Sequence, residues 1–418
     1  DNTKIRLSYG KLGNQNTGDT YAYLEEIVTG QTLNYTLDGT SKLQYSKPSD
    51  PKTSYLTWET IATWNIGLDM SFLNNRLTFT GDYFIRNTEG MLADSYELPG
   101  VFGAKTPDEN CADLRTNGWE LYLGWNDSFA LMGKRFNYTV SATLGDNKTV
   151  FTKFNNPEKN LSNHYEGKVL GEIWGYRVDG LFASDEEAAE YTSKINQDAV
   201  NERILTDKVD PYYRAGDLKF RDLDGDNVIS KGDDTAYDAG DREIIGNETP
   251  RYMYSFRLGA DWNGFDLGIF FQGVGKRDWY PNYLSTGFWG PYSRAFTSFI
   301  PENFMDQCWS EENRDGYFPR FRGYQTFAGS QLGVNNDRYL QDASYIRLKN
   351  LTVGYTLPVL KKVFTKLRVY FTGENLWYWS PMLKHTKYID PEAAGGNGNT
   401  GMAYNYSRNF SVGVDITF

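Results

Sequence analysis

The feature that most constrains the fold is a series of segments, each roughly ten residues long, in which large apolar side chains alternate with small or polar ones. In one of them Trp64, Ile66, Leu68, Met70 and Phe72 alternate with Asn65, Gly67, Asp69 and Ser71. Successive side chains of a strand point to opposite faces, so this pattern predicts strands with one apolar and one polar face. The pattern recurs about ten times, and its parity is confused near Arg347 and Lys349, which indicates a bulge. We therefore expect an all-β protein built on about ten antiparallel strands.

The lengths of the connections distinguish between the β architectures. Short turns at 73–76, 126–134 and 263–264 alternate with long connections at 11–57, 148–248 and 277–339. Bacterial outer-membrane barrels keep short turns on the periplasmic side and long loops outside the cell. A soluble β-sandwich alternates as well, but the strict order of short and long connections favours a transmembrane antiparallel β-barrel with long extracellular loops. On this count the last strand runs inward, and Phe418 lies at the periplasmic rim.

Composition removes several alternatives. The mean hydropathy of −0.60 and the absence of a long apolar run exclude a helical membrane protein, whereas a barrel can read as polar on average. Aromatic residues make up 16% of the chain, which suits either the interfacial girdles of a barrel or a surface that stacks on sugars. The net charge of −11 argues against a nucleic-acid partner.

An enzyme is not expected. Two histidines leave little room for histidine-based acid–base chemistry or zinc. Pairs of acidic loop residues resemble a glycosidase dyad, but sequence does not establish the separation that such chemistry demands. Cys111 and Cys308 are too few for a disulfide framework, and both an unpaired state and one bridge between loops stay open.

The two ends of the chain add expectations about assembly. Residues 1–10 read as strand without a signal peptide, so we expect the N-terminus of an exported protein to lie upstream. The final strand ends in an aromatic residue with apolar residues at every second position, which predicts a barrel-assembly signal; the alternative is a plain core strand. Its residues are Phe410, Val412, Val414, Ile416 and Phe418.

Several stretches resemble the SusC-like (SusC/RagA) TonB-dependent outer-membrane transporters. They are LTWETIATWNIGLDMSFLNNRLTFTGDYFIRNTEGML, ELPGVFGAKTP, RTNGWELYLGWND, PRYMYSFRLGADWNGFDLGIFFQGVGKRDWY, CWSEENRDGYFPRF, YIRLKNLTVGYTLP, RVYFTGENLWYWS and SVGVDITF. Together they follow the chain in order over nearly its whole length. The resemblance implies that residues 1–418 form the C-terminal part of a barrel of about 22 strands. The N-terminal plug and first strands of that family are missing here, and the open edges need them as partners.

The resemblance also implies a function. We expect TonB-dependent active import of nutrient oligomers across the outer membrane of a Gram-negative bacterium, with an oligosaccharide favoured as the cargo and a peptide as the alternative. The implied partners are a SusD-like surface lipoprotein that acts as a lid, the TonB complex, the protein's own N-terminal plug and outer-membrane lipid. One alternative is a secreted, calcium-stabilised all-β protein for carbohydrate binding or adhesion, and another is a passive porin. Solubility distinguishes the barrel from the secreted protein, because a barrel with a lipid-facing surface should aggregate without detergent and a secreted protein should not.

The motif DLDGDNVISKGDD predicts a structural calcium site in the long loop 148–248. Oxygen ligands stand at the first, third, fifth, seventh and twelfth positions of a calcium loop. They are Asp222, Asp224, Asp226, the Val228 carbonyl and Asp233. Asn227 replaces the usual glycine but tolerates the left-handed conformation, and Ile229 can anchor the loop on an apolar neighbour. The alternative is a solvated acidic turn.

The same loop is expected to form a small external subdomain. Ser184 and Glu187 form a capping box ahead of a short helix over 188–195. This subdomain serves gating or lid docking, or it merely shields the barrel rim.

Two further groups of side chains are candidates for contacts with cargo, the lid or the plug. The run WYPNYLSTGFWGPY offers rings that stack on sugar, meet the lid or pack within their own loop: Trp279, Tyr280, Tyr283, Phe288, Trp289 and Tyr292. The inward-facing side chains of the strands predict a polar lumen wall that contacts the plug or solvent: Asp69, Asp82, Glu120, Arg257 and Asp261.

Overall fold

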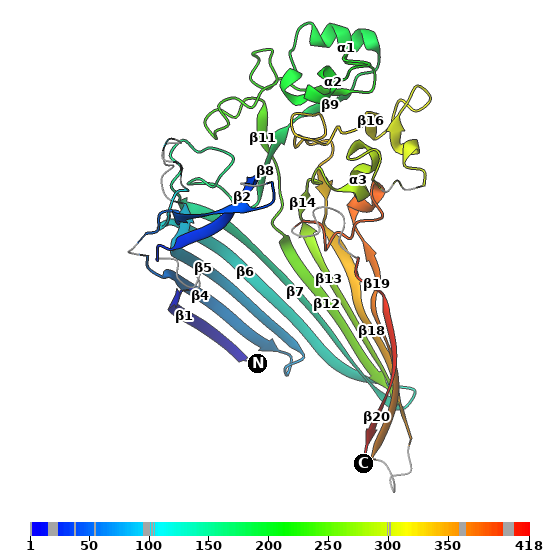
Figure 1. Cartoon of the computed structure of the whole chain (residues 1–418). Coiled ribbons are helices and arrows are strands. Elements are labelled where there is room, and N and C mark those ends of the chain that lie inside the picture. The colour runs from blue at the N-terminus through cyan, green and yellow to red at the C-terminus, as the bar shows by residue number, and fades with distance from the viewer. Residues whose placement is uncertain are drawn as a thin grey trace.

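An open sheet and a folded head above it make up the molecule (Figure 1). The structure is a computed structural model that describes residues 2–15, 24–36, 39–53, 56–94, 101, 103, 105–298, 300, 302–358, 365–395 and 405–418. Part of the ELPGVFGAKTP stretch lies outside the described residues. Both chain ends lie at the end of the sheet that is remote from the head.

The sheet contains ten strands in which neighbours along the chain are also neighbours in space and run antiparallel. Its order is β1 (Asn2–Asn14), β4 (Glu59–Phe72), β5 (Leu77–Asp94), β6 (Asp108–Leu131), β7 (Lys134–Lys153), β12 (Arg251–Trp262), β13 (Phe265–Lys276), β18 (Tyr345–Leu357), β19 (Lys366–Trp379) and β20 (Asn409–Thr417). Within the described residues, the two outermost strands each have one neighbour in this sheet. The expected all-β fold is confirmed, and the sheet is one wall of a barrel.

Tight turns join the strands at the end remote from the head. Asn263 and Gly264 have φ values of 49° and 88°, as the two-residue hairpin turn between β12 and β13 requires. The turn expected over 126–134 is shorter than predicted, because β6 and β7 extend to a two-residue turn at Met132 and Gly133. Those residues also have positive φ values, 52° and 72°.

One face of the sheet exposes its apolar side chains. Leu7, Ile66, Tyr83 and Trp119 lie directly across from one another on four successive strands. The exposed fraction is 50% for Ile66, where a soluble sheet would bury the residue under a second layer. A continuous apolar face of this size is typical of a surface that contacts lipid or another protein.

Long connections lie at the opposite end of the sheet. The first contains the hairpin of β2 (Ile27–Thr36) and β3 (Lys42–Pro48). The others, residues 154–250, 277–344 and 380–395, fold together into what we call the head, within the described residues. No helix in the described part of the chain is long and apolar enough to cross a membrane.

The head consists of short elements. They are β8 (Glu172–Tyr176), β9 (Val178–Leu181), α1 (Asp185–Thr192), η2 (Asp198–Val200), α2 (Glu202–Leu205), β10 (Leu218–Phe220), β11 (Arg242–Asn247), β14 (Asp278–Trp279), α3 (Thr286–Trp289), η3 (Gly290–Tyr292), η4 (Met305–Gln307), β15 (Cys308–Trp309), β16 (Phe318–Arg320), β17 (Gln341–Asp342) and η5 (Pro381–Lys384). Ser184 caps α1 as predicted, because its hydroxyl accepts the Glu187 N–H at 3.1 Å. The helix ends at Thr192 rather than Ile195, and Ile195 packs against the head core instead.

The buried apolar core of the described residues lies in the head, not in the sheet. It draws side chains from all three connections, for example Phe220, Trp289 and Met382, each at most 1% exposed. Aromatic rings dominate this core, and Phe318 contacts Trp289 and Tyr292 with ring centroids 6.3 and 5.8 Å apart. The head is therefore a co-folded unit and not a set of independent loops.

Candidate functional site

The polar face of the sheet has the composition expected of a lumen wall. The strand register puts Asp69, Asp82, Glu120, Arg257 and Asp261 on the face opposite the exposed apolar one. Arg6 donates from Nε to Asp69 Oδ2 at 2.7 Å and from Nη1 to Asp82 Oδ1 at 2.9 Å. Asn137 donates to Asp261 at 2.6 Å. Contact of this wall with a plug stays a prediction.

The bulge predicted near Arg347 and Lys349 is present and serves a purpose that the sequence did not reveal. The register shifts between Leu348 and Asn350 against β19. Arg347 is 1% exposed and forms ion pairs with Asp390 and Glu392 of the head, and Lys349 Nζ donates to Glu392 at 2.8 Å. The cluster ties the last head segment to the inner wall. Its partners are 43 residues apart in sequence, so no local pattern announced them.

The acidic loop adopts the conformation that its sequence predicts. The carboxylates of Asp222, Asp224 and Asp226 gather within 4.8 Å of one another. Asn227 has a φ of 66°, the left-handed conformation expected in place of glycine. Ile229 is fully buried in the head core and anchors the loop, as predicted. The arrangement provides hard oxygen ligands of the type that calcium prefers.

The structure does not bring Asp233 into this group of carboxylates. Asp233 is exposed, whereas Asp241, eight residues further along, is fully buried beside the loop. The Asp241 carboxylate accepts the Leu223 N–H at 2.7 Å and the Ser230 N–H at 2.8 Å, so it joins the two ends of the loop. Burial raises the pKa of Asp241, and these two N–H donors oppose the rise.

The aromatic run requires a correction. Trp279, Phe288, Trp289 and Tyr292 are at most 3% exposed and belong to the head core, so these four rings offer almost no surface to a cargo or a lid. Packing within the loop, one of the alternatives, is what the structure shows for them. The hydrogen bond from Tyr292 to the Pro319 carbonyl, at 2.5 Å, satisfies a buried hydroxyl.

The remaining two rings of the run, Tyr280 and Tyr283, line a cavity of about 330 Å³ at the base of the head, and the edge of the buried Trp279 also contributes to its lining. Tyr283 is 43% exposed. The cavity lies against β14 and is closed on its other side by residues 326–335. Sequence reasoning missed this pocket, because its walls come from separate segments of the chain, spread from Ile173 and Glu248 to Asn335.

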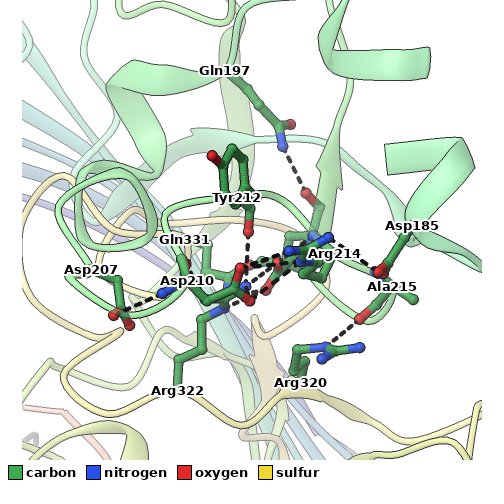
Figure 2. Close-up of polar contacts among 12 residues, drawn as sticks. Asp185, Gln197, Asp207, Asp210, Tyr212, Arg214, Ala215, Arg320, Arg322 and Gln331 are labelled. Carbon is green, nitrogen blue, oxygen red and sulfur yellow. Dashed lines mark hydrogen bonds and ion pairs between the residues drawn. The ribbon is translucent and has the colours of Figure 1, made fainter. Parts of the chain in front are cut away.

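A buried ion pair joins two of the head segments. Arg322 donates from Nε to Asp217 Oδ1 at 3.2 Å and from Nη2 to Oδ2 at 3.1 Å. Figure 2 shows Arg322 also reaching the backbone carbonyls of Asp210 and Tyr212, at 3.1 and 3.0 Å. Burial raises the pKa of Asp217, and the Arg322 guanidinium opposes that rise. The 105-residue separation again gives no local signal in the sequence.

The predicted assembly strand forms the edge strand β20. Its alternate residues Phe410, Val412, Val414 and Ile416 are between 47% and 76% exposed and share the apolar face of the sheet, and Phe418 follows the strand. This position is not that of a buried core strand. Recognition of the strand by assembly machinery stays a prediction.

The two cysteines do not form a disulfide with each other. Cys111 lies on β6 and Cys308 is buried in the head, where its thiol lies beside the Phe304 carbonyl.

Comparison with known proteins agrees with this geometry. No protein-family model matches the chain. TonB-dependent receptor P26 of Formosa agariphila is 27% identical over 99% of this chain, and TonB-dependent receptor SusC of Bacteroides thetaiotaomicron is 24% identical over 99%. The chain spans about two fifths of the length of these relatives, 40% and 37% respectively. Their names are those of receptors, in agreement with the expectation that the chain is not an enzyme.

A solved structure shares the fold. The structure of the RagAB peptide transporter matches the whole chain with a TM-score of 0.69 and 23% sequence identity, and the match covers 41% of that transporter chain. Receptors of this kind lie in the outer membrane of Gram-negative bacteria, where the exposed apolar face of the sheet meets lipid. The chain is thus similar over nearly its whole length to TonB-dependent receptors, SusC among them, and it shares the fold of a chain of the RagAB transporter, so the resemblance read from the sequence is confirmed.

Proposed function

We propose that the whole protein imports a nutrient oligomer across the outer membrane, energised through TonB. The observation that carries the proposal is the division of the sheet into an exposed apolar face and a polar face that bears ion pairs such as Arg6–Asp69. A wall of this kind encloses an aqueous path in lipid. The head at the mouth of that path is folded and carries a pocket lined by Tyr280 and Tyr283, which suits a structure that handles cargo at the entrance.

The proposed cargo is a glycan rather than a peptide, and the proposed lid is a SusD-like surface lipoprotein. RagAB, whose fold this chain shares at 23% identity, is named a peptide transporter, so the fold accommodates peptide cargo in that protein. Support for glycan in this chain comes from the two tyrosines that line the pocket at the base of the head.

Growth and uptake of a deletion strain test the import proposal. The strain is supplied either with pooled neutral oligosaccharides or with pooled short peptides, with and without a functional TonB. We expect loss of oligosaccharide uptake in the deletion strain and in the TonB-deficient strain, and its return with the wild-type gene. Unchanged uptake of both pools would contradict import, and TonB-independent uptake would point to a passive porin. Purification of the protein from outer membranes in detergent should also recover a surface lipoprotein.

We further propose that the acidic loop binds a structural calcium ion. The carboxylates of Asp222, Asp224 and Asp226 would hold it, and it would neutralise their mutual repulsion and stiffen the loop beneath Ile229. The ion takes no part in any reaction. The proposed role is to keep one side of the head folded.

Calcium removal provides the test. Chelation should make the head of the full-length protein more sensitive to protease near the loop, and added calcium should reverse the change. Asp224→Asn should abolish the calcium response. Asp238→Asn, an exposed carboxylate outside the group, is the matched control and should retain the response. Protease sensitivity that is indifferent to calcium in the wild type would contradict the site.

A further inference from the structure

We propose that the cavity at the base of the head is a binding pocket for one unit of a neutral oligosaccharide, held by stacking on Tyr283. The inference rests on the proposed import function and deepens it by naming a site and a ligand class. The pocket has a volume of about 330 Å³ and lies between β14 and residues 326–335. A pocket of this size accommodates one or two sugar rings and leaves the rest of a chain outside.

Tyr283 provides the surface for stacking. Its side chain is 43% exposed, while its backbone carbonyl accepts the Ser293 hydroxyl at 2.7 Å and the Thr326 hydroxyl at 2.9 Å. On one side its ring meets the Phe327 ring, with centroids 5.5 Å apart. The ring is therefore held in place before a ligand arrives, which reduces the entropy lost on binding.

Tyr280 forms a second wall but has no spare hydroxyl. Its OH contacts the carbonyls of Leu332 and Val334, at 3.2 and 2.8 Å, and accepts the Asn336 amide at 3.0 Å. This network fixes the ring at the edge of the cavity. The wall offers apolar ring surface to the CH groups of a sugar, not a hydrogen bond.

Unused polar groups complete the lining. Within the described residues, no side-chain hydrogen bond engages the Glu248 carboxylate, although the neighbouring Arg277 guanidinium interacts with it electrostatically. The side chains of Asn282 and Asn335 each use one atom, since Asn282 Oδ1 accepts the Leu284 N–H and Asn335 Nδ2 donates to the Trp174 carbonyl. In the part of the chain that the structure describes, no hydrogen bond uses the second amide atom of either side chain, so one is available as a donor and the other as an acceptor. This mixture suits vicinal hydroxyls, which donate and accept at once.

The charge of the lining selects among ligands. Among the described residues that line the pocket, Glu248 carries the only formal charge, and it is negative. The nearby cation, Arg277, lies outside the lining and interacts electrostatically with Glu248. A uronic acid, a sulfated sugar or a peptide C-terminus would therefore find no cationic group in the lining itself and would meet this carboxylate. A neutral sugar has no such penalty. A peptide amino terminus is the ligand that Glu248 could favour instead, so the test must separate the two.

The experiment uses the full-length protein, purified from outer membranes with any bound lipoprotein. Binding is measured for a pool of short neutral oligosaccharides prepared from glucan, xylan, mannan and galactan, and separately for a pool of short peptides. We expect Tyr283→Ala to weaken binding of the oligosaccharide pool about tenfold and Tyr283→Phe to restore it, because the ring face is retained. Tyr237→Ala removes a head tyrosine outside the pocket that is more exposed than Tyr283, 71% against 43%, and should leave affinity unchanged.

Glu248→Gln separates sugar from peptide. It should change oligosaccharide affinity only a few-fold, whereas a ligand held by its amino group would lose most of its affinity. The pocket proposal would be overturned if the wild type and Tyr283→Ala bound the oligosaccharide pool with equal affinity. It would also be overturned if the protein bound the peptide pool preferentially and Glu248→Gln abolished that binding. Cellular uptake distinguishes this failure from a broader one. If cells with the wild-type protein still take up the oligosaccharide pool, the import proposal is retained and only the pocket proposal is rejected. If they take up neither pool, the import proposal is rejected as well.

Discussion

The sheet and the head use their apolar residues in opposite ways. Trp64 of the sheet is 59% exposed, while Trp289 of the head is fully buried. In the sheet, backbone hydrogen bonding between strands supplies the order, and the apolar side chains face outward to the membrane. In the head, burial of aromatic rings supplies the order. Tryptophan therefore lies on the outer, apolar surface of the sheet in one region and in a buried hydrophobic core in the other.

The largest expected effect comes from truncating one tryptophan in each region. Trp289→Ala should destabilise the head by about 4 kcal/mol, because it removes a buried ring and leaves a cavity. Trp64→Ala should cost the sheet less than about 1 kcal/mol in detergent, since its ring is not packed in a core. Thermal unfolding and limited proteolysis of the full-length protein measure both. Equal destabilisation by the two variants would break the comparison.

Loss of the ion pair that joins two head segments should give the next largest destabilisation of the head. Arg322→Ala leaves the Asp217 carboxylate buried without its partner and should destabilise the head by about 3 kcal/mol. Arg314→Ala is the control, because the Arg314–Glu311 pair is solvent-exposed and should contribute close to nothing. Head proteolysis is again the measurement. If both arginine variants behave alike, the pair does not hold the segments together.

A charge placed on either side of one strand should show which side meets lipid. Leu123→Arg lies on the exposed apolar face and should cost about 2 kcal/mol and lower the amount of assembled protein in the outer membrane. Tyr122→Arg, the next residue and on the opposite face, should be tolerated. Heat-modifiable mobility on gels follows barrel assembly in both variants. If Tyr122→Arg assembled poorly and Leu123→Arg assembled normally, the lipid-facing and water-facing sides would be the opposite of those assigned.

The smallest expected effect concerns pH. The His385 ring stacks on Tyr317 with centroids 3.5 Å apart, and burial, followed by nearby Lys384 and Arg338, lowers the pKa of His385 to about 4. Because the unfolded chain binds this proton more readily, the stabilisation is complete above the ordinary histidine pKa and declines as the pH falls from about 6.5 towards 4. After allowance for solvent screening, the loss should be about 1 kcal/mol.

His385→Gln should remove that part of the pH dependence, and His164→Gln is the matched control. The pKa of His164 is also lowered by burial, but this residue stacks on Phe151 in a different part of the chain. Head stability is compared between neutral and mildly acidic pH for each variant. An identical acid response in His385→Gln and the wild type would exclude this stacked histidine as its source.

The sheet and the head also differ in how much of their structure the sequence could predict. Strand faces depend on residues two apart, so the alternation at Trp64 to Phe72, and even the bulge near Arg347, could be read from a short window. The Ser184 cap is equally local. The turn after Leu131 was predicted too long, because strands that continue beyond the apolar band lose the pattern that marks them.

The head could not be predicted in this way. Its core and its Asp217–Arg322 pair join residues more than a hundred positions apart, and no spacing rule covers such contacts. For this reason the sequence left three roles open for the aromatic run and did not separate its four buried rings from Tyr280 and Tyr283, since composition alone does not tell a buried ring from an exposed one. The acidic loop was partly predictable, because its three gathered aspartates are close in sequence, whereas the position of Asp241 depends on the fold of the intervening residues.

The two faces of the sheet are assigned to different solvents, lipid on the apolar face and water on the polar face. The most direct test labels cysteines introduced at Leu267 and Gly268, neighbours on β13 that point to opposite faces, with a fluorophore in the full-length protein. Gly268 has open space around an added side chain. In bilayers that contain brominated lipid, the label at 267 should be strongly quenched and the label at 268 should not. Equal quenching at both positions, or stronger quenching at 268, would contradict the account.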